Sequence, residues 1–111
     1  MGLTTEQWEF LKDLAKLIQF IADYQAGLII TGGELWRTEY QQRYNVDHGL
    51  SGTMNSYHLK RLAIDLNFIK GGKVVECPET IGDYWESLDA KNKWGGRWKR
   101  PHDPGHFERR D

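Results

Sequence analysis

The sequence contains only one cysteine, Cys77, so the chain cannot form an intramolecular disulfide bond. Its fold therefore does not depend on an oxidising compartment. We expect Cys77 to pack as a small hydrophobic side chain.

The chain also has no excess of basic charge, because it contains 15 Lys and Arg residues and 16 Asp and Glu residues, for a net charge of -1. Such a chain has no surplus of positive charge with which to hold nucleic acid or an anionic membrane surface. No apolar run approaches transmembrane length. The N-terminus lacks the basic segment and apolar run of a secretory signal. We expect no nucleic-acid partner, no membrane insertion, and a protein that folds in the cytoplasm of the producing cell.

Repeats and low-complexity segments are absent, and the length of 111 residues predicts one domain over residues 1–111, which we expect to be a monomer. The local patterns predict helices over residues 4–27, 38–44 and 78–88. They predict strands over residues 28–31, 62–69, 73–76 and 106–109, and loops over residues 46–56, 94–98 and 102–105. The order of these elements is typical of an α+β domain in which helices pack on one face of a small antiparallel sheet.

The first predicted helix has a capping-box spacing at Thr4 and Gln7. Its apolar residues recur at helical spacing and are expected to face the core: Trp8, Leu11, Leu14, Ala15, Ile18, Ile21 and Ala22. Thr38 is a good N-cap for the second helix.

The strand LAIDLNFI alternates apolar and polar residues, so its apolar side chains point to the core and Asp65 points to the opposite face. Aspartate is disfavoured inside a strand unless it has a partner or a function. An exposed carboxylate, or an ion pair with Lys60 or Arg61, would also account for it.

Histidines elsewhere in the chain suggest a metal site. His58 precedes Asp65 by seven residues, which would separate them by roughly 23 Å if the link were extended. The chain must therefore turn over residues 59–62 before both side chains can reach one ion. His102 and His106 have helical spacing, but Pro104 and Gly105 argue against a helix. One of these two histidines is the expected third ligand.

The whole pattern resembles the zinc peptidases of peptidoglycan, which include D-alanyl-D-alanine carboxypeptidases, D-Ala-D-Ala dipeptidases and phage L-alanyl-D-glutamate endopeptidases. Their signature is roughly S-x-H-x-x-G-x-A-x-D, followed later by an acidic residue three positions before a histidine. The matching residues are Ser56, His58, Ala63, Asp65, Asp103 and His106, with an upstream Arg37-Thr38 pair. The tail GDYWESL…WGGRW…DPGHFE resembles the phage endolysin branch, and the resemblance runs from about Leu28 to Glu108. Arg61 stands where the signature usually has glycine, which puts the shape of the turn after His58 in question.

This resemblance implies a hedgehog-like or D-Ala-D-Ala peptidase-like fold with a Zn²⁺ site at the sheet, held by His58, Asp65 and His106. It implies that Asp103 is the general base, which takes a proton from the attacking water and passes it to the leaving amine. An alternative for Asp103 is a turn-forming role in Asp-Pro-Gly, and both can hold. Arg37 would stabilise the oxyanion or bind a substrate carboxylate.

Two further residues are candidates for support of the site. Ser56 would contribute a hydrogen bond or cap its loop. Glu108 falls on the same strand face as His106; we expect it to lie exposed to solvent, with contact to that ligand as the alternative. His48 and His102 are expected to be loop residues. Tyr57, Trp94 and Trp98 could line a substrate groove, although core packing explains them equally well.

The predicted function is a zinc metallopeptidase that acts on peptidoglycan stem peptides, as an L-alanyl-D-glutamate endopeptidase of the phage endolysin type that reaches the cell wall after release. The first alternative is the same chemistry on D-Ala-D-Ala, as a carboxypeptidase or dipeptidase. The second is a zinc-binding interaction module without catalysis, which would need the ligands but no base such as Asp103.

Overall fold

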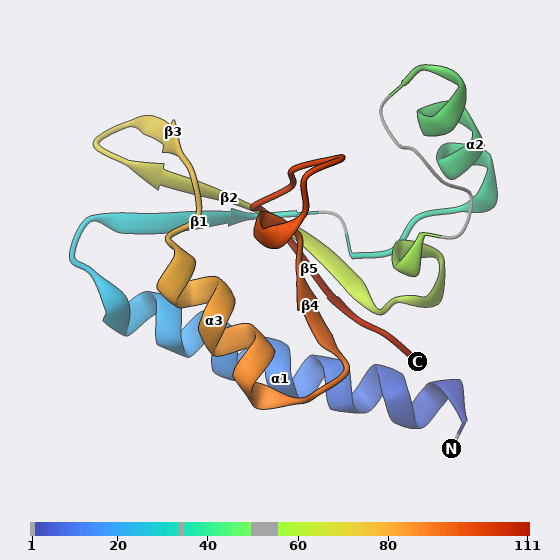
Figure 1. Ribbon diagram of the computed structural model, residues 1–111, viewed down its shortest axis with the longest axis horizontal. Helices are drawn as coiled ribbons and strands as arrows, with labels where there is room; N and C mark the ends of the chain where they lie inside the picture. The colour runs from blue at the N-terminus through green and yellow to red at the C-terminus, as the bar shows by residue number, and fades with distance from the viewer. Residues whose placement is uncertain (1, 34, 50–55) are drawn as a thin grey trace.

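The computed structural model of the protein describes residues 2–33, 35–49 and 56–111. Three α-helices and five strands lie within these ranges (Figure 1). The helices are α1 (Leu3–Tyr24), α2 (Glu39–Asp47) and α3 (Glu79–Leu88). The strands are β1 (Leu28–Gly32), β2 (Ala63–Lys70), β3 (Lys73–Val75), β4 (Asn92–Trp94) and β5 (His106–Arg109). Two 3₁₀ turns, η1 (Tyr57–Lys60) and η2 (Gly95–Arg97), complete the set. Residues 50–55 of the predicted loop over residues 46–56 lie outside the described residues.

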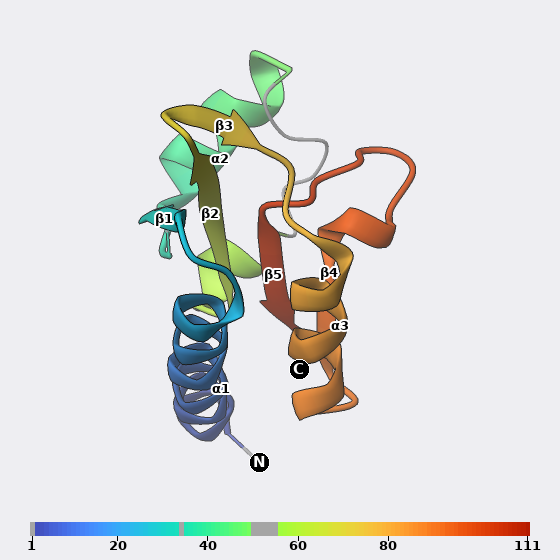
Figure 2. The ribbon, with the colours of Figure 1, turned by 90° about the vertical axis from the view of Figure 1, so that its left-hand side faces the viewer.

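The five strands form one antiparallel sheet in the order β1-β2-β5-β4, with β3 paired to β2 beside β5. Helices α1 and α3 contact each other and cover the same side of the sheet, whereas α2 projects away from it (Figures 1 and 2). This arrangement confirms the predicted α+β class. No described helix is long and apolar enough to span a membrane.

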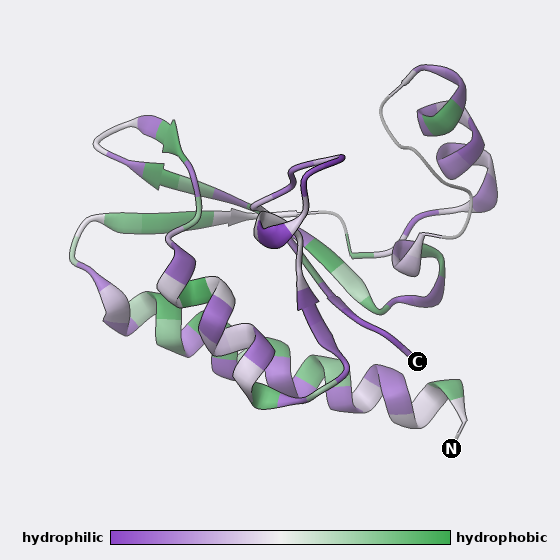
Figure 3. Ribbon diagram, viewed as in Figure 1, coloured by the Kyte–Doolittle hydropathy of each residue, from purple (hydrophilic) through white to green (hydrophobic). Residues whose placement is uncertain are grey.

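The core lies between the sheet and the pair α1 and α3. The side chains that fill it include Phe10, Leu14, Leu17, Ile21, Leu62, Ile64, Leu66, Phe68, Ile81, Trp85 and Phe107. Strand β2 supplies Ile64, Leu66 and Phe68 to this core, as its alternation predicted. Figure 3 shows hydrophobic stretches in β1, β2 and β3 and alternating hydrophobic and hydrophilic stretches along α1 and α3, whereas α2 is largely hydrophilic.

The predicted core face of α1 is partly wrong. Leu14 and Ile21 are buried as expected, but Trp8, Leu11 and Ile18 are exposed. Apolar residues recur at helical spacing on two faces of this helix, and periodicity alone does not say which face meets the sheet. The capping-box prediction is also wrong, because α1 begins after Gly2. The side chain of Gln7 instead donates a hydrogen bond to the carbonyl oxygen of Lys60, at 2.9 Å.

Other local predictions agree with the structure. The Thr38 hydroxyl caps α2 by accepting a hydrogen bond from the Gln41 backbone N–H at 3.0 Å, although the helix continues to Asp47, three residues beyond its predicted end. Pro78 precedes α3, which ends at Leu88 as expected. Strand β4 falls where no strand was predicted.

The turn between His58 and β2 occurs where the metal-site hypothesis required it. The chain forms the 3₁₀ turn η1, and Arg61 then adopts the left-handed conformation with φ 59° and ψ 38°. Among the described non-glycine residues, Arg61 alone has a positive φ. Glycine reaches this region without steric cost, which explains why the family signature has glycine there. The turn is therefore retained with arginine in the glycine position.

Candidate metal centre

Three side chains from separate segments converge on the face of the sheet opposite α1 and α3. His58, Asp65 and His106 each offer one ligand atom, and these atoms lie within 4.8 Å of one another. The Nε2 atom of His58 lies 3.2 Å from one carboxylate oxygen of Asp65, and the Nδ1 atom of His106 lies 2.9 Å from the other. The structure thus brings together the three predicted ligands.

Backbone geometry explains this convergence. Asp65 on β2 and His106 on β5 are direct partners in the antiparallel register, so their side chains leave the same face next to each other. His58 is delivered by η1, and the Ser56 hydroxyl caps that turn by accepting the His58 backbone N–H at 3.2 Å. Ser56 therefore supports the site through the backbone, one of the roles considered for it.

The second nitrogen of each imidazole ring also has a partner. The Nε2 atom of His106 lies 2.8 Å from the Glu108 carboxylate, and the Nδ1 atom of His58 lies 3.4 Å from the carbonyl oxygen of Leu35. Acceptors in these positions hold the ring orientation and leave the inward nitrogens available to a metal ion. Glu108 is buried, so the exposed alternative considered for it is wrong. The contact with Leu35 is a backbone contact, and no side-chain pattern could have indicated it.

The charges at this centre are strongly coupled. Burial raises the pKa of Asp65, but hydrogen bonds with His106 and His58 outweigh burial and hold that pKa well below its ordinary value. Burial lowers the pKa of His106, whereas Asp65 and Glu108 outweigh burial and raise it to about 9. Two imidazole nitrogens and one ionised carboxylate are donors that suit a divalent metal ion, so the residues present fit such an ion.

Asp103 lies beside the three ligands. One of its carboxylate oxygens is 3.9 Å from the Nδ1 atom of His106, and its side chain is about half exposed. Burial raises the pKa of Asp103 above its ordinary value, although the charge of His106 opposes this shift. The carboxylate is therefore near the ligand set without contributing to its tightest contacts.

The loop that carries Asp103 is fastened to the segment that follows β4. The Asp103 backbone N–H donates to the carbonyl oxygen of Gly95 at 3.0 Å, and the Trp94 indole N–H donates to the carbonyl oxygen of Pro104 at 2.8 Å. A Cβ atom at Gly95 would lie 2.2 Å from the Asp103 carbonyl oxygen, so only glycine fits without movement. The sequence pattern did not reveal that the WGG segment holds the Asp103 loop, because these two segments meet only in the folded chain.

Arg37 also lies beside the three predicted ligands. Its guanidinium lies 3.8 Å from the Asp65 carboxylate and donates a hydrogen bond to the side chain of Gln42. The Arg37 backbone N–H donates to the carbonyl oxygen of His58 at 3.3 Å. The arginine is thus held next to the ligands by both its backbone and its side chain.

Of the three aromatic residues considered for the groove, Trp98 lies closest to the ligands, with its ring centroid 5.2 Å from that of His106. Trp94 is buried, and Tyr57 packs against the core. His102 lies outside the ligand set, with its Nε2 atom 2.8 Å from the Glu76 carboxylate, and His48 lies on the C-terminal end of α2. Of the two histidines in HDPGH, His106 is therefore the one at the centre.

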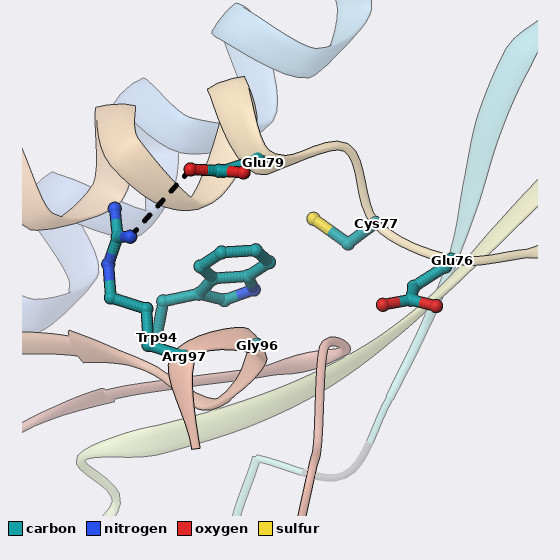
Figure 4. A pocket seen from close by; sticks show the side chains of 6 residues that line it. All are labelled: Glu76, Cys77, Glu79, Trp94, Gly96 and Arg97. Atoms are coloured by element: carbon teal, nitrogen blue, oxygen red, sulfur yellow. Dashed lines mark ion pairs between the residues drawn. The ribbon is translucent and has the colours of Figure 1, made fainter. Parts of the chain in front are cut away.

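A hollow of about 340 Å³ opens beside Asp65 and Asp103 and runs along β2 towards Glu76 and Cys77. A second hollow of about 430 Å³ shares Glu76 and Cys77 and continues to Glu79 and Arg97 (Figure 4). Asp65 and Asp103 therefore border a hollow on the surface of the protein.

Known proteins share both this sequence pattern and this fold. A family model described as D-alanyl-D-alanine carboxypeptidase, of the M15 peptidases, matches residues 50–109. The L-alanyl-D-glutamate peptidase of Listeria phage A118 is 39% identical over 80 residues, which cover 68% of this chain and 28% of that protein. The crystal structure of the Serratia marcescens L-Ala D-Glu endopeptidase ChiX superimposes with a TM-score of 0.66 at 27% identity, covering 88% of this chain and 78% of the other. The chain thus spans less than a third of the length of the phage relative. The predicted resemblance is confirmed: the protein belongs to the M15 peptidase family described as D-alanyl-D-alanine carboxypeptidase.

Proposed function

We propose that the protein is a zinc metallopeptidase that hydrolyses the L-alanyl-D-glutamate bond of peptidoglycan stem peptides, as a phage endolysin does after its release to the cell wall. The observation that carries this proposal is the cluster of His58, Asp65 and His106 with Asp103 beside it. The phage and Serratia relatives, both named as L-Ala-D-Glu peptidases, support the choice of bond.

His58, Asp65 and His106 would hold Zn²⁺, since two imidazole nitrogens and a carboxylate are a usual set of three ligands at catalytic zinc sites. When bound, Zn²⁺ supplies a Lewis acid that polarises a peptide carbonyl and lowers the pKa of a water molecule. Glu108 and the Leu35 carbonyl oxygen keep the two imidazole rings oriented for this task.

Asp103 performs the proton transfers in this mechanism. Its carboxylate takes a proton from the attacking water and then delivers it to the nitrogen of the leaving amine. A raised pKa suits a group that must first accept a proton and then donate it near neutral pH. Arg37 carries a fixed positive charge beside Asp65 and stabilises the negative charge that develops on the carbonyl oxygen.

The test is mass spectrometry of peptidoglycan digested with the zinc-loaded protein. The proposal expects peptides that begin with D-Glu and glycan that retains L-Ala. The family description, D-alanyl-D-alanine carboxypeptidase, names the D-Ala-D-Ala bond as the alternative, and cleavage of that bond would release D-Ala instead. Zinc binding without cleavage of any peptidoglycan would favour the binding module, although such a module has no need of a base at Asp103.

Two variants separate chemistry from metal binding. Asp103→Asn should keep the fold and the zinc but lose roughly 10²–10⁴-fold in turnover, the usual contribution of a positioned acid–base group. Asp65→Asn should instead lower zinc affinity, because a neutral amide replaces a charged ligand. Wild-type turnover in Asp103→Asn would contradict the mechanism.

A further inference from the structure

Helix α2 has the reverse of the usual pattern of burial. Its two buried side chains are the amides Gln42 and Asn45, whereas Tyr40 and Tyr44 are 81% and 45% exposed. A surface helix normally turns its apolar face to the core and its polar face to water. Figure 1 shows that α2 projects from the body, so its tyrosines contribute nothing to the core. Exposed aromatic residues grouped in this way are typical of an interaction surface.

The exposed rings form a row along one side of α2. Tyr40, Tyr44 and His48 are spaced four residues apart, which places them above one another on a helix. The rings of Tyr44 and His48 are stacked, with centroids 3.9 Å apart and planes inclined by 19°. His48 is further held by its Nδ1 atom, 2.8 Å from the Tyr44 carbonyl oxygen. We call these three residues the aromatic row.

Trp36 lies in the segment of the chain that leads from the metal centre into α2. It precedes α2, is 49% exposed, and packs against the guanidinium of Arg61 at 5.1 Å from the ring centroid. Arg61 is the turn residue that follows His58 and η1. The neighbour of Trp36 is Arg37, which lies 3.8 Å from the Asp65 carboxylate. Trp36 is therefore an exposed aromatic residue in the segment between the metal centre and α2.

The proposed function places a glycan strand close to the metal centre, and the inference rests on that function. In peptidoglycan the stem peptide begins with L-Ala, which is joined directly to the muramic acid sugar. A peptidase that cuts after L-Ala must therefore hold a bond only one residue away from the sugar chain. Flat aromatic rings pack against the C–H face of a pyranose ring. We propose that Trp36 and the aromatic row are a docking surface for the glycan strand of peptidoglycan.

The charge and size of α2 favour this occupant over others. The helix carries Glu39, Arg43 and Asp47, so it has no surplus of positive charge to attract an anionic polymer. Its nine residues span only about 14 Å. That length is short for a stable interface with a second copy, which needs about 800 Å² from each partner. A row of rings is instead well matched to consecutive sugars of an extended chain.

The first measurement compares two substrates, intact peptidoglycan and a synthetic stem peptide without sugar, with the zinc-loaded protein. Tyr40→Ala and Tyr44→Ala should each lower the ratio of kcat/KM on peptidoglycan to kcat/KM on the peptide by roughly fivefold to tenfold, the value of one good ring contact. Tyr40→Phe keeps the ring and should keep the ratio, whereas Tyr40→Leu should not. Trp8→Ala, which removes an exposed aromatic residue from α1, is the matched control.

The second measurement does not depend on catalysis. Glycan chains from which an amidase has removed the peptides should shift the NMR signals of the Tyr40 and Tyr44 rings in the wild-type protein. Unchanged signals together with unchanged ratios in both alanine variants would overturn the inference. A dimer in sedimentation that Tyr40→Ala dissociates would also overturn it, in favour of a self-interface. If the wild-type protein cleaves neither substrate, the proposed function fails, and glycan binding still decides the docking surface by itself.

Discussion

The position of Asp103 should depend on Gly95, because the two residues are in backbone contact. An alanine Cβ at this position would lie 2.2 Å from the Asp103 carbonyl oxygen and 3.1 Å from its carbon atom. Real Cβ atoms essentially never approach another heavy atom within 3.0 Å. The opposing atom is backbone and cannot rotate away as a side chain would. Gly95→Ala must therefore push the Asp103 loop outward.

The size of the effect follows from this distance. The contact must lengthen by about 1 Å, and a misplacement of about 1 Å in a reacting group can cost roughly 10²-fold in rate. We therefore expect Gly95→Ala to lower kcat by about 10²-fold, and KM should change as well, because Asp103 lines the hollow beside the metal centre. Overpacking of this kind also destabilises a protein by about 1–3 kcal/mol, so the melting temperature should fall while the fold persists.

The assay combines kinetics on a stem peptide with zinc content and amide hydrogen exchange. The Asp103 amide is bonded to Gly95 and the His106 amide is bonded to the Asp103 carbonyl oxygen, so both should exchange faster in Gly95→Ala. Gly32→Ala is the matched control, because a Cβ at Gly32 meets nothing within 4 Å. A folded, zinc-loaded Gly95→Ala with wild-type kcat would refute the reasoning. Asp103→Asn measured alongside shows whether the base itself is assigned correctly.

Three further predictions follow from single contacts. Glu108→Gln should weaken zinc affinity by roughly 10–100-fold, measured by competition with a chelator, because the neutral amide orients His106 less firmly. Arg61→Gly should keep the fold and leave the melting temperature unchanged or slightly higher, whereas Arg61→Val should lower it, because a β-branched residue is strained at φ 59°. A hydrogen bond with Glu76 raises the pKa of His102. Their ion pair is therefore complete below the ordinary pKa of histidine and is lost as pH rises through the raised pKa. Glu76→Gln should lower the pKa of His102 in an NMR titration.

The three predicted ligands came partly from local signals in the sequence and partly from the family resemblance. Asp65 interrupts an alternating strand, and the odd position within that strand determines which face the carboxylate occupies. Pro104 and Gly105 exclude a helix between His102 and His106, which leaves only one of them for the site. The residue types and spacings needed for these conclusions all lie within single short segments.

The features that could not be predicted depend on contacts between distant segments. The buried face of α1 is one example, because Trp8 and Leu11 have helical spacing as good as that of the buried Leu14. Strand β4 is only three residues long and exists because β5 pairs with it. The need for glycine at position 95 is a further example, since it comes from the nearby Asp103 backbone and not from the backbone angle of residue 95. Each depends on which surfaces meet, and a sequence pattern carries no information about that.

Charge pairing contributes to the convergence of the three predicted ligands. Asp65 and Glu108 are two buried or half-buried carboxylates on either side of His106, and each lies within 3 Å of one of its ring nitrogens. Arg37 balances the remaining negative charge from the opposite side of Asp65. Charge pairing therefore helps hold β2, β5 and η1 together at this centre. A metal ion held by these side chains would bind only the folded chain, so its binding energy would add to the stability of the fold.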